Sequence, residues 1–305
     1  MPKVSIIVPN YNHAEFLIQR IDSILSQTYQ DFELIILDDC SDDNSKDIIS
    51  KYQDHPKVSH IIFNIQNSGG PFYQWERGIK LATGKYIWIA ESDDWCEPST
   101  LHELVKGIEK DNECVISYCQ MSCILSDNRI KWQSHHTHLS EVIDSKNFIR
   151  DYLAVKISIY NASMAIFKKS ASELISRDFI NFKFSGDRLF WIEIAQHGKV
   201  HISGKVLNYF RKHDKDVSGK AYSSGINFIE EFRILNYMYD LKLIENGTYN
   251  LAIRKQFKDY WKVRHKIDPV NNKIIKSLFL NLKSNKFQII KFLPTAIWAA
   301  FKDDK

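Results

Sequence analysis

Clusters of carboxylate, amide and hydroxyl side chains follow four short apolar runs near the start of the sequence. The clusters are Asn10-Tyr-Asn12, Asp38-Asp39 with Asp42-Asp43, Asn67-Ser68, and Glu91-Ser-Asp93-Asp94. Carboxylates at the end of a buried strand are costly unless a cation or hydrogen-bond donors compensate their charge. Glu91 and Asp93 offer oxygen ligands for a divalent metal, Mg²⁺ or Mn²⁺, that keeps open positions for diphosphate oxygens. The alternative is a solvated turn, which the preceding apolar strand and the following Trp95 disfavour.

The elements around these clusters follow the pattern of β-α-β units on a mostly parallel sheet. Expected strands are Val4 to Val8, Phe32 to Leu37, Val58 to Phe63 and Tyr86 to Ile89, and expected helices are Ala14 to Ser26, Ser45 to Tyr52 and Phe72 to Ala82, the last ended by Gly84. Right-handed crossovers bring the carboxyl ends of the four strands to one edge. The polar clusters should therefore meet at the edge where open α/β sheets bind ligands.

Farther along the chain we expect a helix over Pro98 to Lys110, a strand over Val115 to Cys119, and helices only from about Ile226. This organisation predicts a first domain over residues 1–219, with halves 1–97 and 98–219, and a helical extension over 220–305. Neither GxGxxG nor GxxxxGK[ST] precedes the first helix, which disfavours a dehydrogenase or a P-loop protein. A serine hydrolase lacks support because there is no GxSxG elbow.

The order and spacing of several segments resemble those of family 2 inverting glycosyltransferases, over roughly residues 3–218. These segments are Val4 to Asn12 (VSIIVPNYN), Asp38 to Asp43 (DDCSDD), Gly78 to Gly84, and Ile89 to Trp95 (IAESDDW). The resemblance implies a GT-A fold, an α/β architecture with a mixed, mainly parallel, Rossmann-like sheet flanked by helices. It also implies transfer of a sugar from a nucleotide diphosphate donor to an acceptor hydroxyl, in bacterial surface polysaccharide or glycolipid assembly.

The resemblance assigns roles to residues at the edge of the sheet. Pro9 and Tyr11 would line the pocket for the nucleotide base, and Asp39 would accept a hydrogen bond from the N3–H of uracil, which favours a UDP-sugar. Glu91 and Ser92 would contact the nucleotide. Asp93 would be the principal metal ligand, with Glu91 beside it.

Two positions depart from the family pattern. Glu91 stands where an Asp is usual, and Trp75-Glu76 stand where many relatives carry an Arg-Asn pair, so the positive charge near the diphosphate is missing. Arg77, Lys80 or Lys85 could replace it, although each also fits a solvated helix face. Trp75 is equally compatible with a place in the core.

The second half supplies the remaining expected site residues. Asp187, in the run Ser185-Gly-Asp187 before an amphipathic stretch, resembles the family's catalytic base, although the usual Glu before it is Gly186. Its alternative role is to cap a helix. Arg211 and His213 resemble the Arg-x-His that closes over the donor diphosphate, and side chains two apart share one side of an extended strand. His213 is also a candidate metal ligand.

Composition limits the partners and the location. Residues 251–305 hold 13 Lys and Arg against 4 Asp and Glu, whereas residues 1–250 hold 28 against 33. The basic end, above all Lys286 to Lys302, favours an anionic membrane surface or a packed helix, and the acidic remainder disfavours nucleic acid. Five cysteines without a CxxC pair and no secretory signal predict a cytoplasmic protein. A non-catalytic nucleotide-sugar binding protein on the same fold is the alternative function.

Overall fold

The computed structural model describes residues 1–213 and 224–284. Contacts divide the chain into two compact units. The first contains Met1–Ser145, Ile159–Ile180 and residues 193–213, and the second contains Lys146–Ser158, Asn181–Ile192 and residues 224–284. The second unit therefore gathers segments from both sides of the boundary that the sequence suggests near residue 220, and that boundary stays a prediction.

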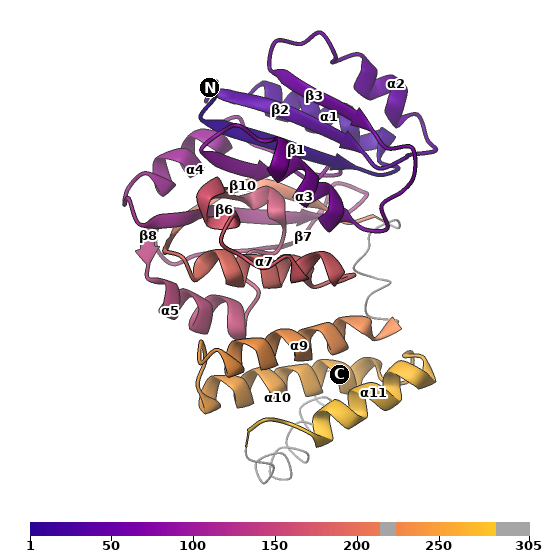
Figure 1. Cartoon of the computed structure of the whole chain (residues 1–305), viewed down its shortest axis with the longest axis vertical. Coiled ribbons are helices and arrows are strands. Elements are labelled where there is room, and N and C mark those ends of the chain that lie inside the picture. Colours follow the sequence, from indigo (N-terminus) through magenta and orange to yellow (C-terminus); the bar gives the residue numbers. More distant parts are fainter. Residues whose placement is uncertain (214–223, 285–305) are drawn as a thin grey trace. The chain divides into compact units, whose positions relative to one another are not determined.

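One large sheet organises the first unit (Figure 1). In the part of the chain that the structure describes, its strands follow the order β3-β2-β1-β4-β9-β6-β10-β5, while β7 pairs with β6 and β8 with β10. The strands are β1 (Val4–Asn10), β2 (Phe32–Asp38), β3 (Val58–Phe63), β4 (Tyr86–Ile89), β5 (Trp95–Cys96), β6 (Cys114–Ile124), β7 (Ile130–Gln133), β8 (Ser140–Ile143), β9 (Ala165–Lys168) and β10 (Lys199–Arg211). β1 to β4 are parallel, whereas β9 runs antiparallel between β4 and β6.

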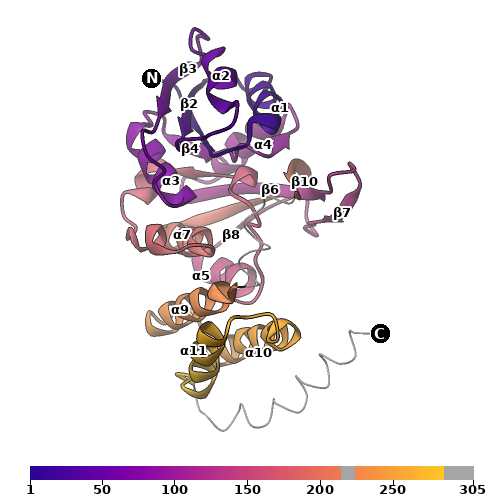
Figure 2. The same ribbon diagram turned by 90° about the vertical axis from the view of Figure 1, so that its right-hand side faces the viewer.

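Helices cover both faces of this sheet. They are α1 (Ala14–Leu25), α2 (Ser45–Ser50), α3 (Pro71–Leu81), α4 (Thr100–Ile108) and the short α6 (Lys169–Ser172). The chain moves outward from β1 to β3 and then returns to β4, so right-handed crossovers place α1 and α2 on one face and α3 on the other (Figure 2). Fully buried strand residues such as Ile7, Ile35 and Trp88 form the core between the layers.

The second unit is helical. It contains most of α5 (Ser145–Phe148), a π-helix over Ile149–Ala154, the start of α7 (Gly186–Ala195), and α9 (Ile226–Asp240), α10 (Asn246–Val263) and α11 (Pro269–Leu280). Phe232, Tyr260 and Phe279 pack edge to face or tilted in its core, with Phe232 and Phe279 centroids 4.7 Å apart. Among the residues described, no helix is both long and apolar enough to cross a bilayer.

The expected strands and helices of the first hundred residues are confirmed, with ends shifted by up to two residues. Gly84 does not end the preceding helix, and that prediction is wrong. α3 ends at Leu81, and Gly84 instead passes β1, where an added Cβ would lie 2.7 Å from the Ser5 backbone nitrogen. The glycine is therefore required for the close approach of the segment before β4 to β1. The predicted membrane segment Lys286 to Lys302 lies outside the described residues.

Candidate active site

The acidic loop after β4 is fastened to its surroundings by Asp94. This carboxylate is fully buried, and its Oδ2 accepts a hydrogen bond of 2.6 Å from Ser163 Oγ. Its Oδ1 accepts from the backbone nitrogen of Arg211 at the end of β10, at 3.3 Å. Burial and the neighbouring Asp93 raise the pKa of Asp94 to about 7. Asp94 therefore joins the loop to β10, and Asp93 is the residue left to face a ligand.

Three side chains in the first unit could hold a metal ion together. One ligand atom each from His13, Asp93 and His213 lie within 4.8 Å of one another, and His213 Nε2 is 3.1 Å from Asp93 Oδ2. Burial would raise the pKa of Asp93, but the hydrogen bond from His213 and the charge of His13 lower it below its ordinary value. Among the described residues, the buried His213 Nδ1 has no hydrogen-bond partner. Two imidazoles, one of which has an unpaired buried nitrogen, and one ionised carboxylate are suitable ligands for a divalent ion.

Arg211 lies beside this cluster and is held from several sides. Its Nε donates to the Asp93 backbone carbonyl at 3.0 Å, and its Nη2 donates to Gln19 Oε1 at 2.6 Å. The guanidinium lies 4.6 Å from the ring centre of Phe16 and 4.5 Å from that of Trp95. Arg211 and His213, which the sequence pairs, thus both contact Asp93, and the planar cation is fixed in position.

Glu91 is not among the three residues of the candidate metal cluster, and its role as a metal ligand stays a prediction. Its Oε1 accepts a hydrogen bond of 2.9 Å from the indole Nε1 of Trp75, and its backbone nitrogen receives one of 3.0 Å from Ser163 Oγ. Burial and the nearby Asp93 and Asp94 raise the pKa of Glu91 to about 8. Trp75, which is only 2% exposed, belongs to the core and also donates to this carboxyl.

The expected base-binding residues lie at the ends of β1 and β2. Pro9 is buried within β1, and Tyr11 is 49% exposed just after it. Asp39 Oδ1 accepts hydrogen bonds from Asn64 Nδ2, the Ser68 nitrogen and Gln74 Nε2 at 2.6 to 2.9 Å. Asp39 Oδ2 accepts from Ser68 Oγ at 2.7 Å, and a carboxylate oxygen has two acceptor sites. Asp39 thus anchors the loop after β3, with capacity at Oδ2 for one further donor.

The sequence reasoning missed His13, and the predicted nucleotide contact of Ser92 stays a prediction. Ser92 is only 2% exposed, and its Oγ forms a hydrogen bond of 2.9 Å with His13 Nδ1. It therefore holds the ring of a residue in the candidate metal cluster. The signal that could have found His13 is its position directly after Asn10-Tyr-Asn12, at the same edge as the acidic loop. No ligand pattern within the local sequence pairs it with residues 80 and 200 positions later.

Asp187 is described within the second unit, in the first turn of α7. Its Oδ1 accepts from the Arg188 backbone nitrogen at 2.7 Å, and burial raises the pKa of its carboxyl to about 6. Arg188 is buried, forms an ion pair with Glu231, and donates to the carbonyl oxygens of Leu153 and Ala154. These bonds fix the first turn of α7, so Asp187 projects from a rigid element.

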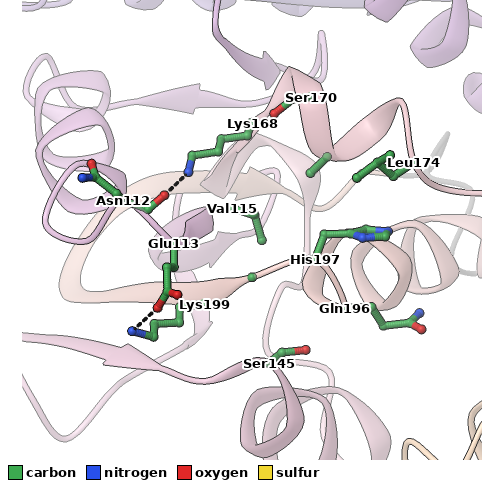
Figure 3. Close-up of a pocket in the computed structure, with 12 residues that line it drawn as sticks. Asn112, Glu113, Val115, Ser145, Lys168, Ser170, Leu174, Gln196, His197 and Lys199 are labelled. Atoms are coloured by element: carbon green, nitrogen blue, oxygen red, sulfur yellow. Dashed lines mark hydrogen bonds and ion pairs between the residues drawn. The ribbon is translucent and has the colours of Figure 1, made fainter.

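A hollow of about 540 Å³ lies in the first unit, away from the acidic loop (Figure 3). Lys199 Nζ forms an ion pair of 2.6 Å with Glu113 there, and Lys168 reaches the Asn112 carbonyl. These residues lie where β6 and β10 begin and β9 ends, which is the opposite end of the sheet from the acidic loop. We therefore place the candidate active site at the acidic loop, where the charged and metal-binding side chains gather, and not at this hollow.

Comparisons with known proteins find a matching family model and several relatives. A family model described as "Glycosyl transferase family 2" matches residues 5–175. An uncharacterized glycosyltransferase from Nostoc sp. is 38% identical over 106 residues, which are 34% of this chain and only 32% of the relative. The GalNAc(5)-diNAcBac-PP-undecaprenol beta-1,3-glucosyltransferase of Campylobacter jejuni is 24% identical over 264 residues, covering 85% of this chain and 81% of that protein.

A likeness to solved structures confirms the predicted GT-A fold. Staphylococcus aureus TarS in complex with UDP-GlcNAc superposes with a TM-score of 0.66 and 22% sequence identity, covering 85% of this chain and 72% of that one. At this identity the likeness concerns the fold, and the site residues rest on the geometry described above.

Proposed function

Because this chain belongs to glycosyl transferase family 2, we propose that it transfers a sugar with inversion from a UDP-sugar to an acceptor hydroxyl. The observation that carries the proposal is the grouping of Asp93, His213 and Arg211 at the carboxyl edge of the sheet. A carboxylate and an imidazole for a divalent ion, next to a fixed guanidinium, suit the diphosphate of a leaving nucleotide.

Charge on the leaving group would be stabilised by this chain's own side chains. Asp93 and His213 would hold the ion, which when bound neutralises diphosphate oxygens and lowers the barrier to their departure. Arg211 would donate to the same oxygens from a guanidinium already oriented by Phe16 and Trp95. No reorganisation of the cation is then needed during the reaction, which is the main advantage of a preorganised site.

The preference for uridine rests on Asp39 and Tyr11. Asp39 Oδ2 can accept a second hydrogen bond, as the N3–H of uracil requires, and the exposed ring of Tyr11 offers a surface for the base. TarS, whose fold is similar, has been solved with UDP-GlcNAc. Pro9 and the backbone of the first polar loop would complete the pocket.

Asp187 is the proposed base that removes the proton from the attacking acceptor hydroxyl. Its support is the family motif and a pKa raised to about 6, which is close to the value that favours proton transfer near neutral pH. The acceptor that we propose is a saccharide carried on a lipid diphosphate at the cytoplasmic face of a bacterial membrane. The Campylobacter relative is named for such a lipid-linked acceptor.

The proposal is tested by donor hydrolysis and by the stereochemistry of transfer. Purified protein with Mn²⁺ or Mg²⁺ is given a panel of UDP-, GDP- and dTDP-sugars, and released nucleotide is measured. UDP release should exceed the other nucleotides, and proton NMR of the transferred sugar should show an anomeric configuration opposite to that of the donor. Binding of UDP-sugars without release under any condition would favour the non-catalytic alternative, and retention of configuration would contradict the mechanism.

A further inference from the structure

Helix α11 packs on the rest of the second unit through its inner face. Ile275 is fully buried there, and the ring of Phe279 meets Phe232 of α9 and Phe257 of α10 edge to face, with centroids 4.7 and 5.0 Å apart. Three apolar side chains of the same helix are exposed to solvent: Val270 by 70%, Ile274 by 42% and Leu280 by 73%. The outer face of α11 therefore carries apolar side chains that the described parts of the chain leave uncovered.

The lysines around this outer face lack acidic partners. Lys266, Lys273 and Lys276 are exposed, and none of them forms an ion pair with another described residue. Asp268 is the only acidic residue between positions 264 and 284, and its side chain is engaged in capping α11 through two backbone nitrogens. The positive charge of the outer face is therefore not compensated within the described part of this unit.

Most of the excess positive charge at the end of the chain lies on described helices. Residues 251–284 hold 9 Lys and Arg against 2 Asp and Glu, whereas residues 285–305 hold 4 against 2. The sequence draws attention to Lys286 to Lys302 because lysines and bulky apolar residues are mixed there. The larger share of the charge nevertheless belongs to α10, α11 and the residues between and after them.

The helical period brings the lysines and the exposed apolar residues of α11 onto one surface. At about 100° per residue, five side chains fall within an arc of about 160°. In angular order they are Lys276, Leu280, Lys273, Val270 and Ile274, and α11 contains no carboxylate. Such a mixture is typical of a helix that lies in the interfacial plane of a membrane. Its apolar side chains enter the headgroup boundary, and its ammonium groups reach lipid phosphates.

We propose that this outer face of α11, formed by Val270, Lys273, Ile274, Lys276 and Leu280, binds the surface of a bilayer that contains anionic lipids. A second copy of this chain is a poor occupant, because a two-fold contact would bring the same lysines together without carboxylates. Lipid phosphates supply the negative charge that the described chain does not provide. The inference deepens the proposed function and rests on it, since a lipid-linked acceptor is presented at such a surface.

The test measures partition of the full chain onto vesicles by flotation. One set of vesicles is phosphatidylcholine alone, and the other also contains phosphatidylglycerol. The wild type should bind the anionic vesicles at least about tenfold more strongly, because each lysine near an anionic surface adds to the attraction. Added salt should reduce the difference, because it screens the exposed charges.

Two double variants separate charge from apolar insertion. Lys273→Glu with Lys276→Glu should lower the partition constant on anionic vesicles by about tenfold or more. Val270→Gln with Ile274→Gln leaves the charge unchanged and should still lower it by about fivefold, because the inserted apolar area is lost. All four side chains are exposed, and melting curves show that each variant is folded.

Two matched controls change the same charge elsewhere. Lys51→Glu with Lys106→Glu alters exposed lysines of the first unit and should change partition by less than about threefold. Lys286→Glu with Lys291→Glu applies the same reversal to the segment after residue 284 and should also have the smaller effect.

Several outcomes would overturn the inference. They are equal partition of the wild type onto both kinds of vesicle, wild-type partition by both α11 variants, and a loss confined to the variant at positions 286 and 291. A dimer in analytical ultracentrifugation that Val270→Gln with Ile274→Gln abolishes, without vesicle binding, would assign the face to a second copy. Failure of the proposed function looks different, because nucleotide release from soluble donors is measured without vesicles and would be absent while vesicle binding persisted.

Discussion

Replacement of Asp187 by Asn should make the protein more stable and far less active at the same time. Burial raises the pKa of this carboxyl from 3.8 to about 6. Above pH 6 the group is ionised in both folded and unfolded protein, so the folded state bears the full cost of holding the charge. One pKa unit corresponds to about 1.4 kcal/mol, giving about 3 kcal/mol as an upper value. The side chain is partly exposed, and solvent screening reduces the expected gain to about 1 to 2 kcal/mol.

The pH dependence gives the prediction its sign. A carboxyl with a raised folded pKa contributes stability that is present below pH 3.8 and is lost as the pH rises through about 6. The Asn variant should therefore melt a few degrees above the wild type at pH 7.5, and the difference should vanish near pH 4. Scanning calorimetry at the two pH values measures it.

Activity should move in the opposite direction. Loss of a general base typically lowers the rate by about 10² to 10⁴, so sugar transfer should fall by that order while UDP affinity by calorimetry is unchanged. The acid limb of kcat/KM, expected near pH 6 in the wild type, should disappear. Asp268→Asn is the matched control, because Asp268 caps α11 through the Val270 and Asn271 nitrogens in the same unit. Near-normal transfer by Asp187→Asn, with no gain in stability, would leave Asp187 a residue of the helix terminus only.

Three further predictions concern the two units. Arg211→Lys keeps the charge but loses the planar contacts with two aromatic rings. The affinity for UDP in the presence of Mn²⁺, measured by calorimetry, should therefore fall about tenfold. An unchanged affinity would show that Arg211 does not bind the diphosphate. Burial lowers the pKa of His201 to about 4. At pH 5 the unfolded protein therefore binds a proton that the folded protein does not. The free energy of unfolding, measured by urea titration, should fall by about 2 kcal/mol from pH 7.5 to pH 5. His201→Gln should flatten that slope if the reasoning holds. Arg188→Met leaves Glu231 buried without its ion-pair partner and should cost about 3 kcal/mol by thermal unfolding, of which adding Glu231→Gln should restore a part.

Much of the nucleotide-side architecture could be predicted from the sequence. Apolar runs such as Val4 to Val8 and Phe32 to Leu37 are fully buried parallel strands, and such strands read as continuous apolar segments. Chain direction and crossover handedness then determine that the loops after β1, β2 and β4 meet. The family resemblance predicts that His213 lies near the metal ligand Asp93. In the structure the two side chains are in contact, although they are 120 residues apart in the sequence.

Other parts of the site depend on contacts that no local pattern records. Ser163 donates a hydrogen bond to Asp94 and accepts one from the Glu91 backbone nitrogen, and these residues lie 69 and 72 positions away in the sequence. Its backbone is set by Asn161, whose side chain accepts from the Ser163 nitrogen at 2.6 Å. The prediction for Gly84 was wrong for the same reason. A glycine is needed there because the backbone of β1 passes close by, and β1 is distant in the sequence. Such roles require the three-dimensional neighbours.

The hydrogen bond between Trp75 and Glu91 also changes how the two departures from the family pattern should be counted. They form one contact, because the indole of Trp75 donates a hydrogen bond to the carboxyl of Glu91. Replacing Trp75 alone with Arg would remove a buried indole from the core and put a cation beside the Glu91 carboxyl, which would favour the ionised form of that acid. Reverting Glu91 alone to Asp would shorten the carboxyl away from that ring. A transplant of this contact into a relative should therefore change the Trp75 position of α3 and the Glu91 position after β4 together.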